Sequence, residues 1–213
     1  MLDLRYERNF WDGEMRYVAG VDEAGRGPLA GPVVAAAVLF LPDVWIEGID
    51  DSKKLSSKRR EQMFDIINER VLSVGVGIIS HTTIDQVNIY QATLEAMNEA
   101  ISELLPAPQH LLVDGRAFHT NGIPSTPIID GDAKCFSIAA ASIIAKVTRD
   151  RLMIEWDKQF PQYGFAKHKG YGTREHFEAI RKFGPCEIHR KSFRPVQDQA
   201  AQPPLPTEPL SNG

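Results

Sequence analysis

Cysteine is scarce in this sequence, because only Cys135 and Cys186 occur among its 213 residues. Two cysteines are too few for a disulfide framework, and their separation does not match the spacing of a metal site. We therefore expect reduced thiols in a cytosolic protein. Neither thiol is a candidate nucleophile.

Long apolar runs are also missing. The N-terminal residues MLDLRYER lack the apolar stretch of a signal peptide, and no run approaches the length of a membrane span. This predicts a cytoplasmic protein with no membrane partner. No dimerisation motif is present either, so we expect a monomer.

A strong excess of one charge is absent as well, because the formal net charge is only -4 at pH 7. Overall charge therefore gives no reason to expect a polyanionic partner. The distribution of charge is uneven, however. The locally basic segment 167–194 has three glutamates against a larger basic set, namely Lys167, Lys169, Arg174, Arg181, Lys182, Arg190, Lys191 and Arg194.

What the sequence does contain is enough apolar residues, 43%, to bury one sizeable core. Apolar runs predict a meander of three strands followed by two shorter strands, at 17–21, 32–41, 71–80, 110–113 and 127–129. Helical periodicity predicts helices at 57–70, 84–105 and 137–159. This order is typical of an α/β or α+β fold. The proline-rich residues 197–213 are expected to be a disordered tail.

The segment 21–31, VDEAGRGPLAG, carries two adjacent carboxylates at the edge of a glycine-rich turn. Asp22 and Glu23 follow a predicted buried strand, where carboxylates need compensation by an arginine, backbone amides or a bound cation. Asp114 ends another predicted strand, and Asp132 lies just before a predicted helix. For Asp132 alone, stabilisation of that helix start is a complete structural explanation.

Four carboxylates around one point suit Mg²⁺ or Mn²⁺, which prefer oxygen ligands. No serine, histidine or thiolate motif near them indicates covalent catalysis. Two such ions, about 4 Å apart, would activate a water and stabilise the leaving oxygen of a phosphoryl displacement. A glycosidase-like carboxylate pair is the competing enzyme. It is weaker, because adjacent residues of a strand point to opposite faces and would not flank one bond.

The chain resembles the ribonuclease HII family over residues 17–196, on motifs that occur in a fixed order. These motifs are GVDEAGRGPLAGPVV from Gly20, DSKKLS from Asp51, LVDG from Leu112 and GDAKCFSIAAASIIAKVTRD from Gly131. Two later segments are also similar to the family, HKGYGT from His168 and HRKSFRP from His189.

The resemblance implies an α/β fold, a ribonuclease H-like mixed β-sheet flanked by helices, with a helical C-terminal extension, all within residues 1–196. It implies an endoribonuclease that cuts the RNA of RNA–DNA hybrids and cuts duplex DNA 5′ of a single embedded ribonucleotide. The products would carry 5′-phosphate and 3′-hydroxyl ends. Asp22, Glu23, Asp114 and Asp132 would be the catalytic metal ligands. Removal of ribonucleotides from DNA would be the role.

A site that distinguishes RNA from DNA must read the 2′-hydroxyl. Gly25, Arg26 and Gly27 suit this reading, because glycines let the backbone approach a sugar closely. On their own they would make an ordinary turn. Tyr171 resembles the family tyrosine that packs against the sugar at the junction, although alone it would be an ordinary aromatic residue. Lys53 is a candidate phosphate contact, together with Lys54, Lys167, Lys169, Arg190, Lys191 and Arg194.

Other roles stay open at this point. His119 would either assist proton transfer or be a plain loop histidine, and Ser142 and Lys146 share a helix face that suits either the site or packing. A non-catalytic hybrid-binding module would carry a substituted carboxylate, and none of the four is substituted. A ribonuclease HIII-type hybrid nuclease would carry an additional N-terminal domain, which we do not expect before Tyr17.

Overall fold

The computed structural model describes residues 2–13, 15–116, 120 and 122–200. A five-stranded mixed sheet, in the order β3-β2-β1-β4-β5, forms its centre. The antiparallel pairs β1–β2 and β2–β3 confirm the predicted meander, and β4 and β5 join it in parallel. The strands are β1 (Val18–Ala24), β2 (Val33–Leu39), β3 (Ser73–Ile79), β4 (His110–Asp114) and β5 (Ser125–Ile128).

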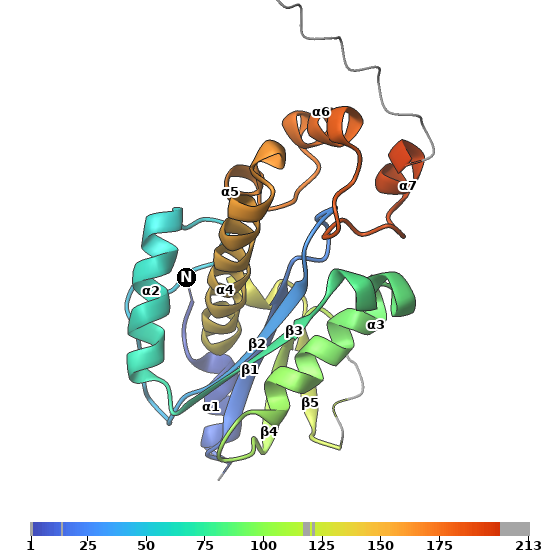
Figure 1. The fold of residues 1–213 in the computed structure, drawn as a ribbon. Helices are drawn as coiled ribbons and strands as arrows, with labels where there is room; N and C mark the ends of the chain where they lie inside the picture. The colour runs from blue at the N-terminus through green and yellow to red at the C-terminus, as the bar shows by residue number, and fades with distance from the viewer. Residues whose placement is uncertain (1, 14, 117–119, 121, 201–213) are drawn as a thin grey trace, which may run out of the picture.

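Helices cover both faces of this sheet (Figure 1). α2 (Ser57–Arg70) and α4 (Phe136–Gln159) pack on one face, and α3 (His81–Ser102) packs on the other. β2 is buried on both sides, because its even-numbered residues face α2 and α4 while its odd-numbered residues face α3. This arrangement confirms the predicted α/β fold. Among the described residues, no helix combines the length and apolarity that crossing a membrane requires.

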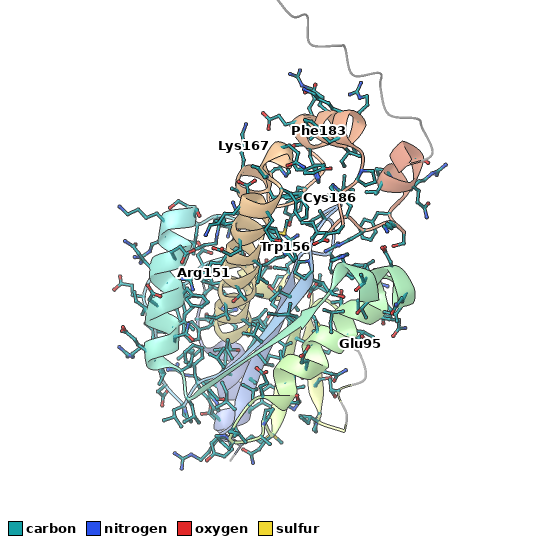
Figure 2. All side chains as sticks on the ribbon, viewed as in Figure 1. Glu95, Arg151, Trp156, Lys167, Phe183 and Cys186 are labelled. Atoms are coloured by element: carbon teal, nitrogen blue, oxygen red, sulfur yellow. The ribbon has the colours of Figure 1, made fainter. Side chains whose placement is uncertain are left out.

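A helical extension follows α4 at one end of the sheet (Figure 1). It contains the 3₁₀ turn η2 (Pro161–Tyr163), α5 (Phe165–His168), α6 (Arg174–Phe183) and α7 (Arg194–Ala200). The extension has its own small core, against which Trp156 and Cys186 pack (Figure 2). α7 ends at Ala200, so residues 197–200 of the expected tail are helical, and residues 201–213 lie outside the described part.

The short helix α1 (Arg5–Trp11) has no counterpart among the predicted elements. A helix this short is not stable by itself and depends on tertiary packing. Tyr6, Phe10 and Trp11 supply that packing against the β1 and β4 side of the sheet. Glu7 is only 1% exposed and accepts hydrogen bonds from the backbone N–H and the hydroxyl of Ser137, both at 2.8 Å.

Most predicted boundaries differ from the structure by a few residues, and two of these differences have a clear physical reason. The helix expected at 84–105 begins at His81 and bends at Asn88, whose φ is 72° and whose Oδ1 accepts from the N–H of Tyr90 at 2.9 Å. The first strand extends beyond its expected end because its pairing with β2 continues to Ala24 and Val34. Asp22 and Glu23 are therefore strand residues, and the turn starts only at Gly25.

Gly20 lets α4 approach β1 closely, which holds the strand carrying the carboxylates in place. A Cβ at Gly20 would lie 2.2 Å from the carbonyl carbon of Ser137 and 2.4 Å from the nitrogen of Ile138. We expect Gly20→Ala to lower the free energy of unfolding by about 3 kcal/mol, since backbone atoms must move. Urea denaturation measures this. Gly13→Ala is the control, because its Cβ would only touch Phe10 at 3.5 Å, and equal stability of the two variants would contradict the account.

Candidate active site

A cavity of about 250 Å³ opens where β1 and β4 end. Strands, loops and helices far apart in the sequence line it, and the lining residues are Asp22, Glu23, Ala24, Gly25, Arg26, Gly27, Ser52, Lys53, Asp114, Ser142, Lys146 and Tyr171. A second cavity of about 560 Å³ adjoins it and shares Glu23, Arg26 and Asp114. The structure thus brings eight of the nine predicted site residues to one cavity, Asp132 being the exception.

Parallel pairing of β1 with β4 brings three carboxylates together. Val21 pairs with Val113, so the next residue of each strand, Asp22 and Asp114, lies at the same edge of the sheet. Glu23 follows on β1 and also lines the cavity, although alternate strand residues point to opposite faces. The site thus gathers three carboxylates at the strand ends, whereas a glycosidase needs only two that flank one bond.

Burial raises the pKa values of all three carboxylates. Burial, with repulsion from Glu23 and Asp114, raises the pKa of Asp22 well above its ordinary value, and a hydrogen bond from Ser142 opposes this. Burial also raises the pKa of Glu23, although Arg26 lies 3.1 Å from its carboxylate. The pKa of Asp114 is raised chiefly by burial too, while the N–H of Gly131 donates to it at 2.6 Å.

Asp132 lies in the 3₁₀ turn η1 (Gly131–Ala133) and is 5% exposed. Its carboxylate accepts from the Nζ of Lys53 at 2.6 Å, and Lys53 itself lines the cavity. The alternative role expected for Asp132 is to stabilise the start of α4. The residue at that start is Cys135, and it makes no side-chain capping bond. The structure therefore pairs Asp132 with Lys53, and it connects this carboxylate to the site through the lysine and through electrostatic repulsion that raises the pKa of Asp114.

The donor set fits a hard divalent cation by its chemistry, because carboxylate oxygens are the ligands that Mg²⁺ and Mn²⁺ prefer. Burial is the largest cause of the raised pKa values of Asp22 and Asp114, and a cation would offset this cost for the charged carboxylates. Among the described residues, however, no three histidine, cysteine, aspartate or glutamate side chains stand grouped for a metal ion. Arg26 holds Glu23 and Lys53 holds Asp132 instead.

The glycine-rich turn forms another wall of the cavity. Gly25 has a φ of 98°, in the left-handed region that favours glycine. A Cβ at Gly27 would lie 3.9 Å from the ring of Tyr171, so the turn and the tyrosine face each other. Tyr171 is 43% exposed, and the Nζ of Lys146 lies 5.7 Å from its ring centre.

The structure also places residues whose roles the sequence left open or did not indicate. Ser142 and Lys146 line the cavity, so the face they share on α4 serves the site. Ser52 also lines it and bonds to Ser142 at 2.9 Å, and only its place beside Lys53 could have signalled it. Lys167 projects outward (Figure 2) and pairs with Glu175 at 2.7 Å. His119 lies outside the described residues.

Arg190 corrects one expectation. A phosphate contact is wrong for this residue, because its side chain is fully buried and donates to backbone carbonyls of the glycine-rich turn. In contrast, Lys191 and Arg194 are exposed. A basic residue in a basic segment looks like a surface residue, and composition alone does not distinguish the two environments.

The chain is similar to known proteins of one family. The family profile "Ribonuclease HII" covers residues 19–196. Ribonuclease HII of Acetivibrio thermocellus is 55% identical over 188 residues, which are 88% of this chain and 73% of that protein. Ribonuclease HII of Geobacter metallireducens is 53% identical over 202 residues, which are 92% of this chain and 95% of that protein.

Solved structures agree. The ribonuclease H2 of Pyrococcus horikoshii superposes with a TM-score of 0.73 at 27% identity, over 86% of this chain and 97% of that one. Ribonuclease HII of Archaeoglobus fulgidus, solved in complex with PCNA, gives 0.69 at 28% identity, over 82% and 93%. A Bst-RNase HIII crystallised with Mn²⁺ gives 0.64 at 18% identity, over 87% and 69%, and supports the fold alone. The chain therefore belongs to the ribonuclease HII family and is a ribonuclease H, an endonuclease.

Proposed function

We propose that this enzyme hydrolyses the RNA strand of RNA–DNA hybrids and cuts duplex DNA on the 5′ side of a single embedded ribonucleotide. The products are 5′-phosphate and 3′-hydroxyl ends. The observation that carries this proposal is the cavity itself, in which the buried Asp22 and the partly buried Glu23 and Asp114 face a glycine-rich turn and a half-exposed tyrosine.

In this proposal Asp22, Glu23, Asp114 and Asp132 hold two divalent ions, Mg²⁺ or Mn²⁺. Bound there, such ions would supply positive charge that stabilises the leaving oxygen and favours deprotonation of the attacking water. The carboxylates would orient these ions. In return, the positive charge of the ions would offset the negative charge that burial makes unfavourable on the carboxylates. Lys53 then becomes free to contact a phosphate once Asp132 has a cation as its partner.

The ribose is read by backbone groups in this proposal. Among the described residues, the N–H groups of Gly25, Arg26 and Gly27 meet no protein acceptor, so they are available to a substrate oxygen. Tyr171 packs its ring against the sugar. Lys53 and Lys146 supply phosphate contacts, which give affinity without sequence preference.

The activity is assigned to residues 1–196 as one catalytic unit acting in the cytoplasm. Its free cysteines support that location. The role is the removal of ribonucleotides from DNA.

A cleavage assay tests the proposal. The substrates are a labelled DNA duplex with one ribonucleotide, the same duplex without it, and a long RNA–DNA hybrid, each with Mg²⁺, Mn²⁺ or chelator. We expect metal-dependent incision immediately 5′ of the single ribonucleotide and none in the all-DNA duplex. Cleavage of long hybrids alone would refute the proposed recognition of a single ribonucleotide. Binding without cleavage under either metal would favour a hybrid-binding module.

Asp22→Asn is expected to lower kcat by about a hundredfold or more on every substrate, because the neutral amide no longer attracts a cation. It is also expected to keep or raise Tm, since a buried carboxylate with a raised pKa is unfavourable in its charged form. Kinetics and thermal unfolding measure the two effects. Asp65→Asn, the same change at an exposed position of α2, is the control, and undiminished turnover by Asp22→Asn would refute the metal assignment.

Tyr171→Ala is expected to lower kcat/KM on the single-ribonucleotide duplex about tenfold more than on a long hybrid, because only one sugar is then available for packing. Stability should change little, since the side chain is 43% exposed. Tyr171→Phe keeps the ring and should behave like the unaltered enzyme. Equal losses on both substrates would count against the role of the tyrosine at the junction.

A further inference from the structure

Two arginines, Arg149 and Arg190, are fully buried yet form no ion pair with a carboxylate among the described residues. Burial lowers the pKa of Arg149 to about 10. Burial, followed by repulsion from Arg149, lowers the pKa of Arg190 to about 9. Both remain charged at neutral pH. Two buried charges without a carboxylate partner reduce folding stability. Proteins usually keep such unfavourable residues only at functional sites.

The guanidinium of Arg190 donates all its side-chain hydrogen bonds in the described part of the structure to carbonyls of one loop. Its Nη2 donates to the carbonyls of Gly25 at 2.5 Å and Pro32 at 3.0 Å. Its Nη1 donates to Arg26 at 3.0 Å, and its Nε donates to Gly31 at 2.9 Å. The planar guanidinium is suited to this task, because its donors point in several fixed directions at once.

Arg149 supports the same loop from α4. Its Nε donates to the carbonyl of Pro32 at 2.9 Å and its Nη2 to that of Ala30 at 3.1 Å. Its Nη1 reaches the carbonyl of Lys169 at 3.0 Å. A Cβ at Gly25 would lie 2.1 Å from the Nε of Arg149, so the arginine packs directly against the turn.

The consequence of these bonds lies in which backbone groups they leave free. The carbonyls of Gly25 and Arg26 are both engaged by Arg190. The N–H groups of Gly25, Arg26 and Gly27 meet no protein acceptor in the described part of the chain. The stretch therefore offers hydrogen-bond donors to a ligand oxygen, and the arginines fix that polarity.

We propose that Arg190 and Arg149 are positioning residues for ribose recognition, which hold the carbonyls of the 25–32 loop so that its N–H groups meet the 2′-hydroxyl. This rests on the proposed ribonucleotide reading. The arginines do not touch substrate. They act through the loop, and the geometry of the guanidinium fork matters more than its charge.

The test measures binding rather than turnover. In an Asp22→Asn background, dissociation constants are measured in Mg²⁺ buffer for two duplexes that differ only in one ribonucleotide. Their ratio isolates the contribution of one 2′-hydroxyl. Adding Arg190→Lys keeps the charge but loses the fork, and we expect the ratio to fall by about tenfold, as for a lost charge-assisted network. Affinity for the all-DNA duplex should change by less than about twofold.

Ile67→Ala controls for stability. Ile67 is fully buried on α2 and belongs to the core cluster that α2 and α4 form with the sheet. The substitution should lower Tm and leave the ratio unchanged. Arg149→Lys should lower the ratio in the same direction as Arg190→Lys, and it gives a second variant if the first does not fold. Equal weakening of both duplexes, or a lowered ratio in Ile67→Ala, would overturn the positioning role. A ratio of one in the Asp22→Asn background would instead refute the ribonucleotide reading itself.

Discussion

The parallel pairing of β1 with β4 is the constraint on which the site depends. It sets Asp22 beside Asp114 at the edge of the sheet, because the paired residues Val21 and Val113 immediately precede them. β2 buries both of its faces and thereby anchors β1 between two layers of helices. Gly20 lets α4 reach β1, and α4 in turn brings Ser142 and Lys146 to the same cavity. The strands and the helix that form the core therefore also carry the residues of the site.

Two groups of charged residues at this site are kept at a cost in burial. Carboxylates whose pKa values are raised line the cavity, whereas two arginines lie behind the glycine-rich turn with no carboxylate partner in the described part of the chain. Each set is unfavourable by itself, since burial penalises charged groups. The carboxylates suit cations, and the arginines hold a loop whose N–H groups at residues 25–27 meet no acceptor among the described residues and so suit a ligand oxygen. An RNA-containing backbone brings anionic phosphates and 2′-hydroxyl oxygens into the same small space.

The sequence predicted the regular parts of the fold well, because period and length are strong there. The meander was recognisable from apolar runs and α2 and α4 from helical periodicity, and Asp22, Glu23 and Asp114 from their places at the ends of predicted strands. Side-chain partners were not recognisable. Nothing local reveals that Lys53 reaches Asp132, that Arg190 is buried, or that α1 forms only by packing on the sheet. These features depend on contacts between residues far apart in the chain.

The bonds between the C-terminal extension and the glycine-rich turn also set an order of events during synthesis. The N–H of Leu29 donates to Gly170, that of Gly31 donates to Ile188, and that of Arg190 donates back to Leu29. The turn leaves the ribosome early, whereas its partners are made more than a hundred residues later. A nascent chain can therefore build most of its sheet before the glycine-rich turn has its partners. The proposed recognition of a ribose then requires nearly the whole chain to have emerged.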